Sequence, residues 1–378
     1  MREISLHTVR PERVLLKALL LFGALNVLFA FIHPPLTAFV WRRDASRLPV
    51  IVEPASPSDA FSKNGFQRTY ITDLDLLFRS HIISARPASD NEYRVVLIGD
   101  SSVWGVSLFP HETMAAVINA MNLKTCTGQH IAVYNLGYEF GSAPKDMIIL
   151  SKALAYDPDL VVWFFSLVGF THRRERLFFV TENKGKQTAA ETESTETPRD
   201  VPPSLQVFWQ RTIIGRRQEL SRIVRLNLSQ WMLSILGTDV PDLREPRPRA
   251  SGKYSSDDPA FFGIQPPARL SAYASFDVLN TAEAISQQVK MVYINEPIGR
   301  GQLSGVRYNS YYPRWAYDQY RERMAAIAAE KNWIYYDLWD YLPPTDFSDT
   351  PFHHTPQGEQ RLAQKIAEII LAQSCRQP

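Results

Sequence analysis

The chain has 378 residues and a formal net charge of +2, from 41 basic and 39 acidic side chains. Because the two charges nearly cancel, the chain has no overall positive field to attract a polyanion, which argues against a nucleic-acid partner. The length suits one large α/β domain with an anchor and insertions. Only two cysteines occur, Cys126 and Cys375, without the spacing of a zinc site. We expect no metal and no other cofactor, and whether the cysteines pair stays open.

The N-terminal region contains an apolar stretch, residues 14–32, which is interrupted only by Lys17, Gly23 and Asn26. That length can cross a bilayer. A cleaved signal peptide would have a shorter apolar region followed by a small-residue cleavage site. We therefore expect a retained single-pass anchor rather than a core helix of a soluble protein. A slight excess of basic residues before the stretch places the N-terminus inside and the rest of the chain outside the cytoplasm.

Three parts follow from composition: a tail and anchor over 1–41, a stalk over 42–92 that packs onto the domain, and a catalytic domain over 93–378. Within the domain, runs rich in β-branched and aromatic residues alternate with helical stretches. This pattern predicts an α/β fold, a three-layer doubly wound parallel sheet. The expected strands are 94–98, 130–136, 160–167, 288–294 and 333–338, and the expected helices are 111–122, 142–156, 315–331 and 356–372.

A long insertion, about residues 171–285, separates the third and fourth strands. Its first part, 183–204, has few large apolar side chains and is predicted to be a flexible loop. Residues 209–236 carry apolar positions at helical spacing with interleaved arginines. This pattern fits either a basic helix on an anionic membrane surface or lid, or an ordinary helix packed on the domain.

The first strand of the domain runs into Gly99, Asp100, Ser101 and Ser102. Glycine lets the backbone turn at the carboxyl end of a strand, which is where open parallel sheets bind ligands. Ser101 would then stand at a helix N-terminus, where backbone N–H groups and the helix dipole can stabilise an oxyanion. The pattern makes Ser101 a candidate nucleophile.

A serine hydroxyl needs a base to become a nucleophile, and the base needs an orienting carboxylate. Residues 347–358 offer both groups, because Asp349 stands four residues before His353, just ahead of the last helix. Asp349 can accept a hydrogen bond from Nδ1 of His353 and leave Nε2 facing the serine. His354 and Asp346 are the alternative base and carboxylate. The other interpretation is a polar loop that only starts the helix, which leaves the doubled histidine unexplained.

Three motifs together resemble the SGNH/GDSL hydrolase superfamily: G-D-S-S at 99–102, N-L-G at 135–137 and D-x-x-x-H-H-T-P-x-G at 349–358. The resemblance covers roughly residues 90–375, in the family's order, and implies a flavodoxin-like sheet. It further implies that Ser101 is the nucleophile and gives a backbone oxyanion donor, Gly137 gives a second backbone donor, His353 is the base and Asp349 its partner.

Two departures from the family pattern stand out. Thr350 occupies the place where the family has its acidic residue. After the third strand the family has an asparagine whose side chain donates to the oxyanion, whereas residues 166–170 contain none. Ser166, Asn135 or Thr171 could replace it, and losing such a donor costs ~10²–10³ in rate. Membrane-linked relatives that transfer acyl groups to extracellular glycans also depart from these motifs.

These observations predict a membrane-anchored, extracytoplasmic serine esterase or O-acyltransferase, with an acylated cell-envelope glycan or lipid as its partner substrate. The alternative is an inactive accessory protein of the same fold that assists a membrane acyltransferase.

Three further stretches are interpreted more simply. Lys145 and Asp146 are expected on a solvated helix start, and residues 163–165 in the core. The tyrosine-rich residues 308–320 fit either a sugar-binding platform or packing against the insertion.

Overall fold

The computed structural model describes residues 10–40, 45–49, 52–54, 66–68, 74–173, 203–235, 258–301 and 305–375. They fall into two compact units. One unit contains α1 (Pro11–Ile32), a 3-10 turn (Leu36–Phe39), α7 (Pro203–Arg211) and most of α8 (Arg217–Ile235). The second contains the other elements. Nearly all of the loop predicted over 183–204 lies outside the described residues.

The second unit is built on a five-stranded sheet in the order β4-β3-β5-β6-β7, in which all paired strands are parallel. Strand β3, the first strand of this sheet along the chain, lies between β4 and β5, which is the order of a doubly wound fold. The predicted fold class and all five strands are confirmed. Their bounds are β3 (Glu92–Ile98), β4 (His130–Asn135), β5 (Leu160–Phe165), β6 (Lys290–Asn295) and β7 (Ile334–Asp337). A separate antiparallel pair, β1 (Val52–Pro54) and β2 (Phe66–Arg68), precedes this sheet.

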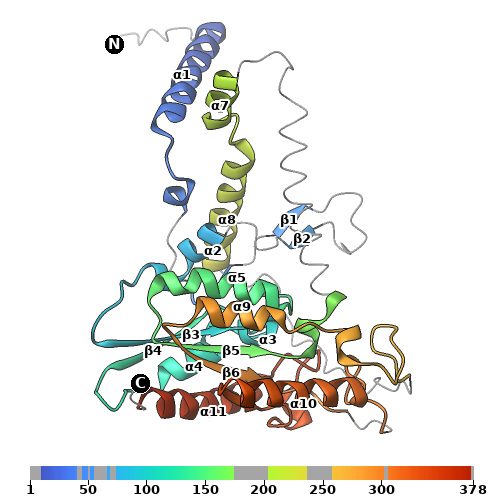
Figure 1. Cartoon of the computed structure of the whole chain (residues 1–378). Coiled ribbons are helices and arrows are strands. Elements are labelled where there is room, and N and C mark those ends of the chain that lie inside the picture. The colour runs from blue at the N-terminus through green and yellow to red at the C-terminus, as the bar shows by residue number, and fades with distance from the viewer. Residues whose placement is uncertain are drawn as a thin grey trace, which may run out of the picture. The chain divides into compact units, whose positions relative to one another are not determined.

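Helices cover both faces of the sheet. Figure 1 shows α5 and α9 on one side and α4 and α11 on the other. Helix α9 lies within the predicted insertion, yet it leads back into β6 and packs beside α5, so it belongs to the regular α/β pattern. The helices of this unit are α2 (Leu74–Ser80), α3 (Ser101–Trp104), α4 (Met114–Ala120), α5 (Ala143–Ala153), α9 (Asp277–Ile285), α10 (Arg314–Glu330) and α11 (Pro356–Ser374).

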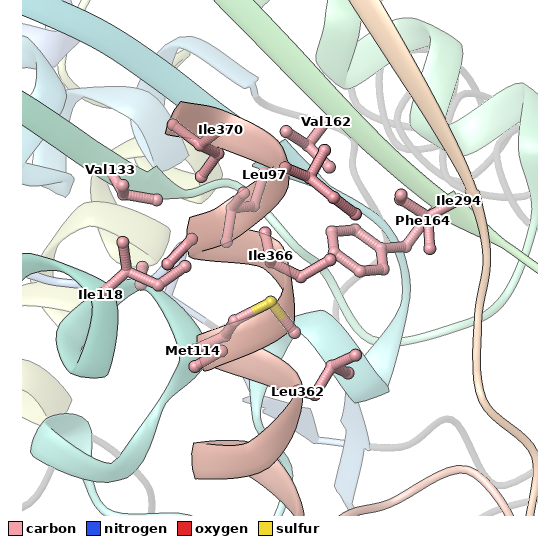
Figure 2. Packing of buried hydrophobic residues seen from close by; sticks show 14 of the residues in the cluster. Leu97, Met114, Ile118, Val133, Val162, Phe164, Ile294, Leu362, Ile366 and Ile370 are labelled. Carbon is pink, nitrogen blue, oxygen red and sulfur yellow. The ribbon is translucent and has the colours of Figure 1, made fainter. Parts of the chain in front are cut away.

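The core under α4 and α11 follows from strand and helix periodicity (Figure 2). Alternate side chains of each strand point to one face of a sheet, and Leu97 and Val162 are fully buried on this one. Helix α11 meets them with Leu362, Ile366 and Ile370, spaced four residues apart on one helical face. This packing holds α11, and the loop that precedes it, against the sheet.

A disulfide joins Cys126 to Cys375, with their Cα atoms 5.2 Å apart. It ties the segment before β4 to the end of α11, across 249 residues of sequence. The question that the sequence left open is thereby answered in favour of a bridge.

Two residues of the predicted stalk, Arg47 and Leu48, bond to the domain. The buried guanidinium of Arg47 donates to the carbonyls of Trp104, Gly105 and Leu108 at 3.2, 2.7 and 3.1 Å. The indole N–H of Trp104 in turn donates to the Leu48 carbonyl at 2.8 Å. Because Trp104 is the last residue of α3, these bonds fasten the stalk to the short helix that begins with Ser101.

In the first unit, α1 is the one helix of the described residues that is long and apolar enough to cross a membrane. It has 22 residues, and most of its apolar side chains are exposed. The helix predicted over 209–236 is present as parts of two helices, α7 and α8, which are separated by the non-helical residues 212–216.

Candidate active site

Ser101 is the first residue of α3, two residues beyond Gly99 at the carboxyl end of β3. Asp100 is the N-cap, and its Oδ1 accepts from the Ser102 N–H at 2.9 Å. A side chain at Gly99 would place a Cβ atom 2.6 Å from Val103, so the residue is glycine because helix and strand lie too close for any other. The N–H of Ser101 is one of the first in α3 and has no acceptor within the helix.

The loop before α11 brings the predicted histidine and carboxylate to this serine. Ser101 Oγ lies 3.0 Å from His353 Nε2. Nδ1 of the same ring lies 2.8 Å from Asp349 Oδ1. Both side chains of the pair are largely buried, with 13% of His353 and 12% of Asp349 exposed. Three residues selected from two distant sequence motifs therefore form one chain of hydrogen bonds.

Thr350 explains the unusual spacing of this pair. Its Oγ1 accepts hydrogen bonds from the N–H groups of Phe352 and His353, at 3.3 and 3.1 Å. This turn takes up the extra residue between Asp349 and His353, since it folds the chain back before the histidine. Thr350 thus shapes the loop, while the carboxylate that meets His353 comes from the preceding position.

The alternative histidine and carboxylate serve the structure instead. His354 is buried, and its Nδ1 lies 2.7 Å from Glu359 Oε2. The other oxygen of Glu359 accepts from the Met114 N–H at 2.8 Å, which links α11 to α4. Asp346 gives its main-chain carbonyl to the Thr355 N–H at 2.8 Å and pairs with Arg361 at 3.3 Å. Neither group is bonded to Ser101.

Gly137, the predicted second oxyanion donor, has a partner within the protein. Its N–H donates to Asn135 Oδ1 at 3.0 Å. A Cβ at this position would lie 2.5 Å from the Trp104 nitrogen, so glycine is needed for the close approach of this turn to α3. The close approach to α3 therefore explains why residue 137 is glycine. Its N–H is bonded to the Asn135 side chain.

None of the three side chains considered as replacements for the missing asparagine is free. Asn135 also donates to the Val103 carbonyl at 2.7 Å, so both ends of its amide are engaged. Thr171 Oγ1 donates to the Val168 carbonyl at 2.8 Å. Ser166 is buried and accepts from the Tyr312 hydroxyl at 3.1 Å.

A buried carboxyl beside the helix that begins with Ser101 was not predicted from the sequence. Glu296 directly follows β6 and is fully buried, and its Oε2 accepts from Ser102 Oγ at 2.6 Å. Burial and, secondly, the charge of Asp100 raise the pKa of Glu296 from its usual 4.5 to about 8, against hydrogen bonds from Ser102 and Ser166 that lower it. The sequence feature that could have revealed Glu296 is an acidic residue directly after a predicted buried strand.

Lys145 and Asp146 are buried, so the prediction of a solvated helix start is wrong. Lys145 Nζ donates to the carbonyls of Gly99 and Tyr138 at 2.8 and 2.7 Å. It also pairs with Asp146 at 2.7 Å. Burial raises the pKa of Asp146 from 3.8 to about 6, although the Lys145 charge opposes this. The ammonium group therefore joins the turns that follow β3 and β4, next to Ser101.

The aromatic stretches pack in the interior. Trp163, Phe164 and Phe165 are buried, as expected. In the tyrosine-rich stretch, Tyr312, Tyr317 and Tyr320 are fully buried, which favours packing over a sugar platform.

Within the described ranges, no group of three or more His, Cys, Asp or Glu side chains is placed to hold a metal ion. Comparison with known proteins gave no matching family model and no matching curated protein.

Several solved structures are similar to this chain. One is described as a lipolytic protein of the G-D-S-L family from Desulfitobacterium hafniense, with 14% identity, a TM-score of 0.35, and coverage of 73% of this chain and 99% of that one. An acetylxylan esterase from Geobacillus stearothermophilus has 13% identity, a TM-score of 0.37, and coverage of 77% and 99%. An acylhydrolase from Bacteroides fragilis has 12% identity, a TM-score of 0.34, and coverage of 76% and 91%.

Proposed function

We propose that the chain is a membrane-anchored serine esterase or O-acyltransferase of the SGNH/GDSL type. The observation that carries the proposal is the hydrogen-bonded series of Ser101 Oγ, the His353 ring and the Asp349 carboxylate, at 3.0 and 2.8 Å. These separations are those of a nucleophile with its base and of a base with its orienting group.

The geometry assigns one role to each residue. Asp349 accepts from Nδ1–H of His353, which keeps the lone pair of Nε2 directed at the Ser101 hydroxyl. As Ser101 Oγ attacks the carbonyl carbon of an acyl ester, its proton moves to Nε2. The same proton then passes to the departing alkoxide, the ester C–O bond breaks, and the acyl group remains on Ser101. Water or a sugar hydroxyl, deprotonated by His353, releases the acyl group as an acid or as a new ester.

The oxyanion of the tetrahedral intermediate needs hydrogen-bond donors. The Ser101 N–H, at the start of α3, has no acceptor within the helix and is the first candidate donor. The Gly137 N–H contributes if it turns from Asn135 to the substrate oxygen.

The substrate and the location form part of the proposal. Helix α1 suits a membrane anchor, and the Cys126–Cys375 disulfide suits a domain that folds in an oxidising compartment outside the cytoplasm. An enzyme held at that surface meets acyl esters of cell-envelope glycans and lipids. A membrane acyltransferase that supplies acyl groups is the expected protein partner.

A fluorophosphonate probe, which reacts with activated serines, tests the assignment on the full chain in detergent. We expect labelling of the wild type and none of Ser101→Ala. Ser151→Ala, on the exposed surface of α5, is the matched control and keeps full labelling. Equal labelling of all three proteins refutes the proposal.

A second candidate is an accessory protein that no longer performs catalysis. It is favoured by the engagement of Ser166, Asn135 and Thr171 within the protein, which leaves none of them to replace the side-chain oxyanion donor. If Ser101→Ala and His353→Ala both kept full function in a cell-envelope acylation assay, the accessory role would replace the catalytic one.

A further inference from the structure

Helix α8 carries a stripe of large apolar side chains that are exposed in the described part of the chain. Val224, Leu228, Trp231 and Ile235 repeat at spacings of three and four residues, so they share one helical face. Each is at least half exposed, at 50–67%. On α7, Leu205 and Trp209 are exposed in the same way. Apolar stripes on globular helices normally face the protein core, so these exposed faces require another apolar surface.

The break between the two helices docks on the candidate membrane span. Asn26, in the interior of α1, accepts hydrogen bonds through Oδ1 from the N–H groups of Ile213 and Ile214, at 2.7 and 3.3 Å. It is buried, unlike most of α1. Asn26 lies six residues before the end of α1, which corresponds to a depth of about 9 Å.

The backbone N–H groups of this break all have hydrogen-bond acceptors. Thr212 N–H donates to the Trp209 carbonyl of α7 at 3.0 Å, and Gly215 N–H donates to Thr212 Oγ1 at 3.0 Å. The N–H groups of Arg216 and Arg217 donate to the carbonyls of Thr212 and Ile214, at 2.9 and 3.3 Å. With the two bonds to Asn26, each N–H from 212 to 217 has an acceptor. A loop in water has no need of this, whereas irregular backbone at membrane depth does, because hydrocarbon offers no hydrogen bonds.

Residues 203–235 are rich in arginine, and one of these arginines bonds to the chain directly after α1. Arg216 donates to the Pro34 carbonyl at 3.1 Å, which sets the start of α8 beside the end of α1. Residues 203–235, which comprise both helices and the break between them, contain five arginines and a single acidic residue, Glu219. Arginines next to apolar side chains are typical of helices that lie in a membrane interface, where they meet the headgroups.

We propose that α7 and α8 form a second membrane-contacting element, docked on α1, whose exposed apolar face enters the lipid leaflet in which the C-terminal end of α1 lies. This inference rests on α1 being the anchor of the proposed enzyme. It assigns residues 203–235 of the insertion between β5 and β6 to the lipid surface, with lipid as the occupant of the apolar face.

Site-directed spin labelling of the full chain in phospholipid nanodiscs tests it. A label on Leu228→Cys is compared with one on Gln218→Cys, an exposed polar position of the same helix, and with one on Leu20→Cys within α1. The native cysteines are already paired and do not take the label. We expect the Leu228 label to prefer dissolved oxygen over a water-soluble nickel chelate several-fold, as at Leu20, and the Gln218 label to show the reverse.

Two results would overturn the inference. Leu228 and Gln218 labels with the same aqueous accessibility would show that α8 lies in water, whether or not Leu20 is in lipid. Spin–spin broadening between Leu228 labels would assign the face to a second copy of the chain. Fluorophosphonate labelling of Ser101 in the same samples reports on the catalytic proposal separately, so either proposal can fail without the other.

Discussion

Replacing Glu296 by glutamine should make the protein more stable at neutral pH and leave its stability unchanged in acid. The carboxyl is fully buried, and its pKa is raised from 4.5 to about 8, chiefly by burial. Glutamine keeps the shape and can still accept from Ser102 Oγ, but it cannot ionise in the unfolded chain.

The sign follows from proton linkage. Below pH 4.5 the carboxyl is protonated in both states and adds no pH dependence. Between 4.5 and about 8 the unfolded chain ionises while the folded protein stays protonated, so the free energy of unfolding falls as pH rises. Each pH unit costs about 1.4 kcal/mol, which gives about 3 kcal/mol by pH 7. Above about 8 both states are ionised and the loss is complete.

Denaturant unfolding of the full chain in detergent, measured from about pH 4 to 8, gives the free energies. The difference between Glu296→Gln and the wild type should grow from near zero to about 3 kcal/mol at pH 7. Asp146, whose pKa is also raised, is present in both proteins and cancels. Glu322→Gln, at an exposed carboxyl on α10, is the matched control and should show no such growth.

A difference that stays constant over this pH range would refute the reasoning, because it would mean that Glu296 ionises in the folded protein as it does in the unfolded chain. A Glu296→Gln variant that becomes less stable than the wild type as pH rises would show that the buried group is held as a charged partner.

Three further predictions concern the loop before α11 and the bridge at its end. Asp349→Asn should slow fluorophosphonate labelling by ~10³–10⁴, since the amide cannot hold the productive tautomer of His353; unchanged labelling would exclude Asp349 as the orienting group. His354→Leu should keep labelling within a few-fold but lower the free energy of unfolding by about 1–3 kcal/mol, because a buried acceptor loses its donor; strong loss of labelling in a folded variant would exchange the roles of the two histidines. Reduction of Cys126–Cys375 should lower the free energy of unfolding by about 3–5 kcal/mol, since a long loop is released in the unfolded chain, and equal denaturation curves with and without dithiothreitol would contradict this.

The strands and the candidate catalytic residues were accessible to sequence reasoning for a common reason. Buried parallel strands are continuous apolar runs, which a local pattern reveals. Ser101 follows one such run, and His353 precedes a helix with a clear start. Their contact was a prediction from chemistry, because a serine nucleophile requires a base. The catalytic roles of the contacting residues stay predictions until the labelling experiment is done.

Other features were hidden because they depend on what surrounds a residue. Lys145 and Asp146 have the composition of a solvated helix start, and only the packed ends of β3 and β4 reveal that they are buried. Glu296 carries no local sign of its raised pKa, because the cause is its burial. The break between α7 and α8 was also missed, since its hydrogen bonds are completed by Asn26 from a distant helix.

The amino-acid sequence by itself determined the order of strands and helices, the apolar N-terminal helix and the identity of the candidate nucleophile, because each is encoded in neighbouring residues. Only the tertiary structure decided which histidine reaches Ser101, that Asp349 rather than Asp346 orients it, that Gly137 donates to Asn135, and that the two cysteines join. Those outcomes depend on distances of a few ångströms between segments far apart in the chain, and packing of the sheet, α4 and α11 sets these distances.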